Sequence, residues 1–224
     1  LEGGSSQGNF GNFNLALHVG DNQDSVLVNR DLLESHYNLP STPVWMNQMH
    51  SNISVDANSI TSIVEADASY SRKTGIVCGV LTADCLPVFI SNKKGTIVGI
   101  AHAGWKGLVG GIIESLIGSS GCNGSDLVVH LGPSISKLFF EVGEEVNSQY
   151  LSRNQNFKRS FTLRNNKYYL DLYDAAKVVL EGFGVSSISG GNRCTYKESD
   201  QFFSYRRDGV HSGRMAHLIW MEQS

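Results

Sequence analysis

Cysteine and proline are scarce in this sequence, and the cysteines are widely spaced. The 224 residues include 4 Cys and 4 Pro. The cysteines stand at positions 78, 85, 122 and 194 and form no C-x-x-C pair, and a chain of this length can bury a sufficient core without covalent cross-links. We therefore expect reduced thiols in a cytoplasmic protein rather than a disulfide framework.

Long apolar runs are also missing, and neither sign of charge predominates strongly. No stretch of about 20 apolar residues is present, so no transmembrane helix is expected, and no signal-peptide pattern is visible. The net charge is −3, and no basic cluster suggests nucleic acid or anionic lipid as a partner. With 41% apolar and 17% charged residues, the sequence indicates one globular domain, 1–224, that binds small molecules. The oligomeric state is left open.

Apolar periodicity predicts an irregular alternation of strands and helices. Strands are expected over 13–19, 43–50, 75–81, 95–101, 126–131, 167–170, 201–205 and 216–221, and helices over 24–38, 104–118, 141–151 and 171–183. The runs G-I-V-C-G-V-L and G-T-I-V-G-I-A are β-branched and nearly unbroken, as strands buried on both faces are. The mixture of hairpin and crossover links favours an α+β domain with mixed sheets flanked by helices.

Three candidate metal ligands accompany the predicted strands. His50, Cys85 and His102 each lie at or just past the C-terminal end of one. Strand ends gather in space, and the loops there carry functional sites. The three residues are too far apart for a zinc finger, whose paired ligands lie roughly two to five residues apart. One Cys and two His from separate strands are instead typical of a catalytic zinc site with an open fourth position, and Asp84 is a candidate partner for a ligating histidine.

The same residues allow two other interpretations. A lone cysteine in a β run is commonly a core residue, and a lone histidine is commonly a satisfied polar one. In the second interpretation Cys85 is a nucleophile and His102 is the base that generates its thiolate. The A-H-A-G sequence around His102 places small residues where a ligand can approach closely, which favours a functional site.

Cationic side chains that suit an anionic group occur in two places. F-F-S-Y-R-R-D-G contains Arg206 and Arg207, and guanidinium groups bind phosphate through paired hydrogen bonds. Lys106 begins the helix expected after His102, where anions are favoured. A solvated surface position is the alternative for all three. The remaining histidines show no partner and are interpreted as structural or surface residues: His18, His36, His130, His211 and His217.

Taken together, these motifs resemble the bacterial laccase-domain family, also called multicopper polyphenol oxidases. The resemblance runs in order along essentially the whole chain. It rests on T-A-D-C-L-P-V, A-H-A-G-W-K-G, L-G-P-S-I, E-V-G-E-E-V, Y-Y-L-D-L, C-T-Y, F-F-S-Y-R-R-D-G and G-R-M-A. The opening G-G-S-S-Q-G and M-N-Q-M-H fit the family as well.

The resemblance implies a purine nucleoside phosphorylase that cleaves adenosine, inosine and methylthioadenosine with phosphate. Adenosine deamination is also ascribed to the family, and so is the editing of peptidoglycan precursors, which here would be cysteine or metal amide hydrolysis. The family's fold resembles that of a toxin deamidase with a Cys-His pair. Its metal-binding and catalytic His, Cys and His fall on His50, Cys85 and His102, with zinc as the expected metal and copper as the alternative.

Some properties of the family are not carried over. The family often has an arginine just ahead of the opening Gly-Gly, where Leu1 and Glu2 stand here, so phosphate binding is not assigned to this loop. A copper-dependent polyphenol oxidase is a further alternative, but multicopper oxidases need many more histidines than the 7 present. Trp105, Phe202 and Tyr205 are candidates for stacking on a purine, with core packing as the alternative.

Overall fold

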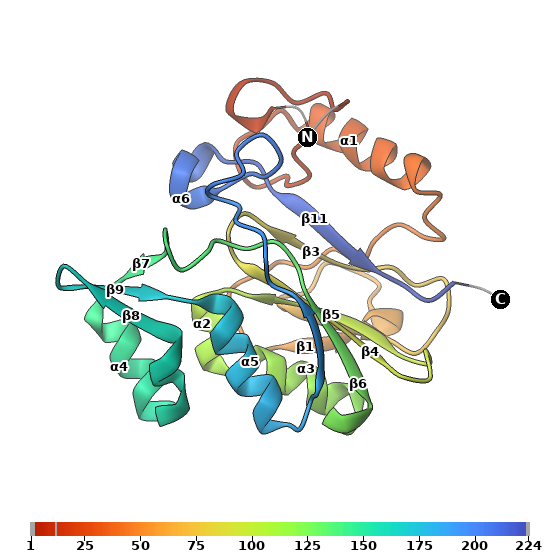
Figure 1. Cartoon of the computed structure of the whole chain (residues 1–224). Coiled ribbons are helices and arrows are strands. Elements are labelled where there is room, and N and C mark those ends of the chain that lie inside the picture. Colours follow the sequence, from red (N-terminus) through yellow and green to blue (C-terminus); the bar gives the residue numbers. More distant parts are fainter. Residues whose placement is uncertain (1–2, 12, 223–224) are drawn as a thin grey trace.

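A six-stranded mixed sheet is the centre of the computed structural model, which describes residues 3–11 and 13–222 (Figure 1). The strand order is β1-β2-β5-β4-β6-β10. The bounds are β1 Ser54–Asp56, β2 Ala68–Ser71, β4 Leu86–Asn92, β5 Val98–Ala103, β6 Leu127–Leu131 and β10 Ser187–Gly190. The outer pairs β1–β2 and β6–β10 are parallel and the inner pairs are antiparallel. The predicted mixed sheet of an α+β domain is confirmed.

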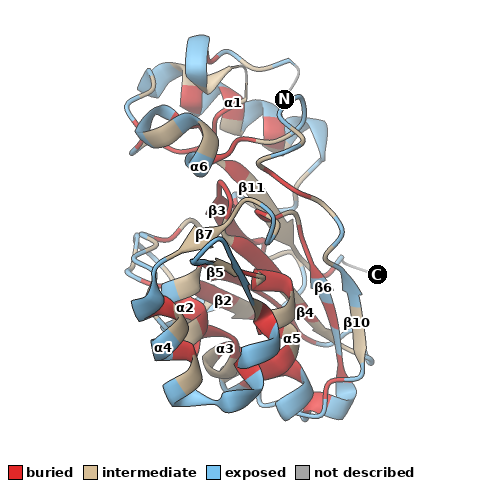
Figure 2. Ribbon diagram, turned by 60° about the vertical axis from the view of Figure 1, so that its left-hand side comes forward, coloured by how far each residue is buried: buried red, intermediate tan, exposed pale blue. Residues whose placement is uncertain are grey.

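Helices cover one face of this sheet. The helices on this side are α2 Trp105–Gly110, α3 Ile112–Ser120, α4 Glu144–Arg153 and α5 Leu172–Gly182. Two others, α1 Gln23–His36 and α6 Tyr205–Asp208, lie elsewhere in the fold. Short 3-10 turns occur at Gly8–Phe10, Ala57–Ser59, Gly124–Asp126, Gln155–Ser160 and Gly209–His211. α3 packs on β1, β2 and β5, and α5 packs on α2 and α3. Figure 2 shows buried residues, in red, between these helices and the sheet. None of the described helices has the length and apolarity needed to cross a membrane.

The alternation of side chains along β5 explains why both faces of the sheet are apolar. Ala101 and Ala103 join the main core with Leu108 of α2, whereas Ile100 joins a second core with Val80 on the opposite face. That face is covered by an antiparallel pair, β3 (Cys78–Thr82) and β11 (Met215–Ile219). α1 and α6 lie beyond β11 at the top of Figure 1.

A small third sheet lies beside α4. It consists of β7 (Glu141–Val142), β9 (Lys167–Leu170) and β8 (Phe161–Arg164), all antiparallel. Residues 141–142, predicted as the start of a helix over 141–151, therefore form β7, and the helix α4 begins at Glu144.

Three of the predicted strands are wrong. Residues 13–19 form turns, in which the side chain of Asn14 bonds the backbone of Ala16. Residues 43–50 form only isolated bridges, and residues 201–205 lead into α6, whose N-cap is Ser204. In each case an apolar pattern reflects packing of a loop against the core and not a strand ladder.

Two further boundaries differ from expectation. β4 is not among the predicted strands, and its second residue is Pro87, which is tolerated near the start of a strand. The single helix predicted over 104–118 is two helices. Gly111 adopts a left-handed φ of 95° between them, a conformation that glycine adopts readily and that breaks the helix.

Candidate active site

The pairing of β4 with β5 brings Cys85 and His102 to one end of the sheet. His102 lies opposite Pro87 in the register, and Cys85 directly precedes β4. Gly104 follows β5 at this end, and a Cβ atom there would lie 2.8 Å from Sγ of Cys85 and 2.7 Å from Cδ2 of His50. The missing side chain at Gly104 is therefore what lets the cysteine and the histidine meet.

His50 reaches the site from a loop. Its φ of 58° is left-handed, an uncommon conformation for a residue with a side chain. The carboxylate of Asp67 holds the loop by accepting the backbone N–H groups of Met49, His50 and Ser51, at 3.1, 3.1 and 2.6 Å. The hydroxyl of Ser51 donates to the same carboxylate at 2.7 Å. The strand predicted to end at His50 is thus replaced by a loop wrapped around one buried acid.

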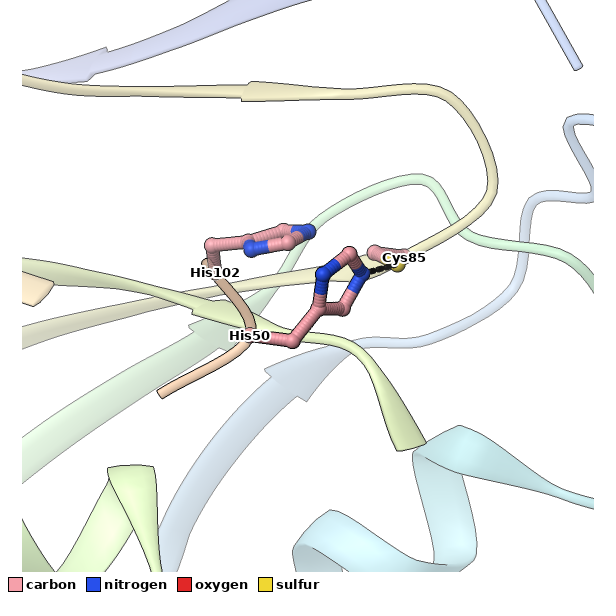
Figure 3. Close-up of side chains that lie close together, drawn as sticks. All are labelled: His50, Cys85 and His102. Atoms are coloured by element: carbon pink, nitrogen blue, oxygen red, sulfur yellow. Dashed lines mark hydrogen bonds between the residues drawn. The ribbon is translucent and has the colours of Figure 1, made fainter. Parts of the chain in front are cut away.

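The three predicted ligands converge (Figure 3). Nε2 of His50 lies 3.7 Å from Sγ of Cys85, and the centroids of the two imidazole rings are 4.8 Å apart. One ligand atom from each residue lies within 4.8 Å of the others. Tetrahedral zinc, with Zn–N near 2.1 Å and Zn–S near 2.3 Å, requires ligand atoms roughly 3.5 Å apart. The donor set and spacing therefore fit one metal ion, with a fourth position open.

A buried contact orients His102. Its Nδ1 atom lies 2.8 Å from Oδ1 of Asp67, which is fully buried. Burial alone would raise the pKa of Asp67, but hydrogen bonds from His102 and Ser51 outweigh burial and lower this pKa to about 2. Asp67 is therefore the ionised carboxylate that fixes the ring of His102, an arrangement that is common where a histidine binds a metal.

Cys85 and His102 influence each other's protonation. Burial opposes charge on both, but the mutual attraction of thiolate and imidazolium lowers the pKa of Cys85 to about 6 and raises the pKa of His102 to about 9. Without metal, the pair therefore favours a thiolate beside an imidazolium. Because metal ligands must be deprotonated, metal binding here would release the proton of His102.

Asp84 does not have the role that the sequence indicated. Its carboxylate accepts hydrogen bonds from Oγ1 of Thr195 at 2.6 Å, Oγ of Ser204 at 3.0 Å and the backbone N–H of Arg206 at 2.7 Å. Its carboxylate is thus engaged with the C-terminal segment, and the backbone at Asp84 is left-handed, with a φ of 91°. Asp84 thus anchors the loop before Cys85 to the C-terminal segment. The partner of the ligating histidine is Asp67, which carries no local sequence signal.

A cavity of about 480 Å³ opens over the three ligands. Its aromatic walls are Trp105, Phe140 and Tyr205, and its cationic walls are Arg206 and Arg214. The remaining lining residues are His18, Gln48, His50, Leu81, Thr82, Ala83, Asp84, Cys85 and His102. The volume lies within the range of roughly 300–1,000 Å³ typical of small-molecule sites.

The predicted cationic residues are not all in this cavity. Arg206 is in its wall, where the guanidinium donates to the carbonyl oxygens of Phe139 and Glu141. Arg207 lines a separate cavity and pairs with Asp208, and Phe202 lines that cavity too.

Lys106 is exposed and outside the described cavity walls, with Nζ 5.6 Å from the centroid of the Trp105 ring. Sequence reasoning missed Arg214 and His18, which do line the cavity above His50, Cys85 and His102. Arg214 belongs to the G-R-M-A motif, whereas His18 has no local signal. Leu1 and Glu2, which replace the family's arginine, lie outside the described residues.

Comparison with known proteins identifies the family. The family model described as multi-copper polyphenol oxidoreductase laccase matches residues 1–222. The chain belongs to this family. Its relatives include the purine nucleoside phosphorylase YfiH of Escherichia coli, 43% identical over 98% of this chain and 90% of that protein. The purine nucleoside phosphorylase of Haemophilus influenzae is 39% identical over 99% of this chain and 91% of that protein.

Solved structures of similar proteins have the same fold. A protein of Neisseria meningitidis superposes with a TM-score of 0.94 at 40% identity, covering 99% of this chain and 91% of that chain. YlmD of Geobacillus stearothermophilus gives 0.87 at 28% identity, with 99% and 89% covered. The resemblance found in the sequence and the α+β single-domain fold are confirmed.

Proposed function

We propose that the protein is a purine nucleoside phosphorylase and that its active site is the cavity above His50, Cys85 and His102. The observation that carries the proposal is the identity of 43% and 39%, along nearly the whole chain, with two proteins of that name. The proposed substrates are phosphate with adenosine, inosine or methylthioadenosine.

The residues of the cavity suit the needs of phosphorolysis. In this reaction a phosphate oxygen forms a bond to C1′ of the ribose, the C1′–N9 bond breaks, and the purine leaves with its electron pair and takes a proton. A planar base requires flat apolar walls, which Trp105, Phe140 and Tyr205 provide. The phosphate requires a cation, and of the three predicted cations Arg206 is the one in the described cavity wall. His50 is exposed and carries a ring nitrogen that can donate to the leaving purine.

Zinc is the metal that we propose for His50, Cys85 and His102. A zinc ion there would supply Lewis-acid polarisation of a substrate oxygen or nitrogen. Copper sites with two His and one Cys take a long axial Met or Gln. No methionine is among the described lining residues, and both ends of the Gln48 amide bond the backbone of Leu81. The donor set therefore favours zinc. A multicopper oxidase would need further ligand clusters, and the described residues form this single one.

A cysteine amide hydrolase is the second candidate, and one specific observation favours it. Cys85 lies beside two histidines, and Asp67 orients His102 through Nδ1, which is the order of a nucleophile, a base and an orienting carboxylate. Its substrate would be the amide of a cell-wall precursor. Adenosine deamination is less favoured, because zinc deaminases need a carboxylic acid that moves protons. Asp84, the acid in the described cavity wall, has its carboxylate engaged elsewhere.

Release of free base tests the proposal. Inosine and adenosine are incubated with and without phosphate, and the products are separated by chromatography. We expect phosphate-dependent hypoxanthine and adenine from the wild type, loss of turnover in His50→Ala and Cys85→Ala, and normal turnover in the control Cys122→Ser, whose thiol is outside the described cavity. No base release by the metal-loaded wild type overturns the proposal. An amidase activity that Cys85→Ser abolishes and a chelator does not affect would establish the second candidate.

A further inference from the structure

A buried polar network near the N-terminus has no role in the function described so far. Ser6, Asn14 and Asn29 are almost fully buried. The carboxylate of Asp21 accepts hydrogen bonds from Oγ of Ser6 at 2.6 Å and from Nδ2 of Asn14 at 2.9 Å. Nδ2 of Asn29 donates to the backbone oxygen of Asn14 at 2.8 Å. Buried polar groups satisfied in this way hold a segment in one arrangement.

This network holds the backbone of Arg214 in place. Oδ1 of Asn14 accepts the N–H of Arg214 at 2.9 Å, and the N–H of Leu15 donates to the carbonyl oxygen of Arg214 at 3.3 Å. The opening segment, to which the sequence assigns no phosphate binding, therefore supports a cationic residue from the other end of the chain. That residue is in the wall of the catalytic cavity.

The Arg214 side chain has no acidic partner among the described residues. Nη1 donates to the carbonyl oxygens of Ser212 and Gly213 at 2.6 and 3.1 Å, and the guanidinium lies 5.7 Å from the centroid of the Tyr205 ring. Within residues 3–11 and 13–222, no hydrogen bond is formed by Nε or Nη2. Burial lowers the pKa of Arg214, yet a guanidinium stays charged near neutral pH. The charges of Cys85 and Asp84 oppose this effect at a distance, but neither forms an ion pair with Arg214, so an anion bonded to Nε and Nη2 would stabilise the partly buried cation further.

A second cavity of about 360 Å³ meets the catalytic cavity at this arginine. The two share His18, Tyr205 and Arg214 in their walls. The other described walls of the second cavity are Val19, Gly20, Val210 and His211, so no acidic residue is among them. The junction of the two cavities thus combines a guanidinium with imidazole groups, and the carboxylate of Asp84 in the catalytic cavity wall is bonded to Thr195, Ser204 and the backbone of Arg206.

We propose that Arg214, together with His18, forms a phosphate-binding subsite at one end of the catalytic cavity. The Nε and Nη2 groups of a guanidinium form a fork that matches two phosphate oxygens, and an imidazole N–H can hold a third. The subsite deepens the proposed phosphorylase function and rests on it for the identity of the bound group. The same chemistry serves inorganic phosphate as co-substrate or a phosphate group carried by the nucleoside.

The location suits an attacking phosphate. The subsite and the three metal ligands line one cavity, so a phosphate on Arg214 and a nucleoside over His50 and Cys85 would occupy neighbouring space. Arg206 is in the same cavity wall, but its guanidinium already donates to two backbone oxygens. Arg214 also donates to two backbone oxygens, but through Nη1 alone, so its Nε and Nη2 groups remain together as a fork, whereas both Nη atoms of Arg206 are engaged. We therefore expect Arg214 to dominate phosphate affinity.

Binding of inorganic phosphate to the full chain tests the subsite directly. Calorimetry measures the Kd of phosphate for wild type, Arg214→Gln and the control Arg164→Gln, whose exposed guanidinium lies over the Tyr169 ring. We expect Arg214→Gln to raise the Kd of phosphate at least about tenfold, because a charged paired contact is lost, while the control is unchanged. His18→Ala should raise the Kd by a smaller factor. Equal phosphate affinity in wild type and Arg214→Gln overturns the proposal.

Two further measurements exclude misfolding as the cause of weaker binding and identify the source of the bound phosphate group. Circular dichroism and thermal unfolding establish that Arg214→Gln is folded, which is expected because the network binds the backbone of Arg214 and not its side chain. Competition with a nucleoside 5′-monophosphate separates the two sources. If that ligand binds in an Arg214-dependent way and inorganic phosphate does not, the subsite is assigned to the substrate's own phosphate. If phosphate binds through Arg214 and no nucleoside is cleaved, the subsite stands and the proposed phosphorylase function fails.

Discussion

Nδ1 of His102 lies 2.8 Å from Oδ1 of Asp67, and this carboxylate also accepts the backbone N–H of His50. One fully buried acid therefore positions two of the three candidate metal ligands, one through its ring and one through its loop. The third, Cys85, is positioned from the other side by Asp84, whose carboxylate is tied to the C-terminal segment. The site thus depends on two carboxylates that are not ligands.

Replacement of Asp67 by Asn should weaken metal binding. An amide cannot match the charged acceptor opposite Nδ1 of His102, and loss of such a partner typically lowers metal affinity by about 10–100-fold. Competition with a chromophoric chelator measures the affinity for zinc. Asp126→Asn, an exposed substitution elsewhere, is the control. Equal zinc affinity in Asp67→Asn and wild type would contradict the role assigned to Asp67.

Replacement of Gly104 by Ala should disrupt the site without unfolding the protein. The backbone at Gly104, with φ −66° and ψ 166°, suits any residue, so the penalty is steric. The added Cβ would lie 2.7 Å from Cδ2 of His50 and 2.8 Å from Sγ of Cys85, closer than real contacts allow. We expect the variant to be folded but to bind zinc at least about tenfold more weakly. Gly110→Ala, where a Cβ meets nothing within 4 Å, is the matched control, and similar zinc affinity in both variants would show that the contact is unimportant.

Asp84 should influence the free energy of unfolding in two separable ways: its hydrogen bonds stabilise the fold, and its left-handed backbone is unfavourable for any residue with a side chain. Asp84→Ala removes a charged acceptor of three hydrogen bonds and leaves a side chain at a φ of 91°, so we expect a loss of about 3 kcal/mol or more in the free energy of unfolding. Asp84→Gly removes the same bonds but fits the conformation, and should be about 1 kcal/mol less destabilising. Urea denaturation measures both. If Asp84→Ala is as stable as Asp84→Gly, the backbone argument is wrong.

His217 should make the fold sensitive to acid. Burial and the charge of His102 lower the pKa of His217 from 6.5 to about 3, and its Nε2 atom lies 2.8 Å from Oγ1 of Thr82. Because the folded-state pKa is below the unfolded value, the neutral ring contributes stability that is complete above pH 6.5 and is lost as the pH falls towards 3.

The difference between wild type and His217→Gln isolates this contribution. Urea denaturation at a series of pH values should show the wild type losing stability faster than the variant below pH 6.5. His36→Gln, a substitution at an exposed histidine, should follow the wild-type curve. Parallel curves for wild type and His217→Gln would mean that His217 does not titrate differently in the folded state.

The fold class and the convergence of the three candidate ligands could be predicted because their signals are local. The β-branched runs before Cys85 and His102 specify buried strands, and paired strands bring their ends together. The convergence of His50 was predicted for a partly wrong reason, because it stands on a loop and not on a strand. The strand β4, which has a proline near its start, was not predicted. The helix expected after His102 is divided in two by a left-handed glycine.

The supporting residues could not be predicted because their roles depend on contacts between distant parts of the chain. Asp67 is 35 positions from His102, and Asn14 is 200 positions from Arg214. No pattern near any of them indicates the partner. Asp84 is the opposite case, since its place beside Cys85 suggested a role as the partner of a histidine, whereas its carboxylate bonds Thr195, Ser204 and the backbone of Arg206.

The sugar product of the reaction tests the central claim most directly. Metal-loaded wild type and Cys85→Ser are incubated with inosine and phosphate, and phosphorus NMR follows the conversion of inorganic phosphate to ribose 1-phosphate while the metal content of each sample is measured. We predict ribose 1-phosphate in equal amount to hypoxanthine for the wild type, and neither bound metal nor product for Cys85→Ser. Free ribose in place of ribose 1-phosphate, or undiminished product from metal-free Cys85→Ser, would contradict phosphorolysis at the His50, Cys85 and His102 site.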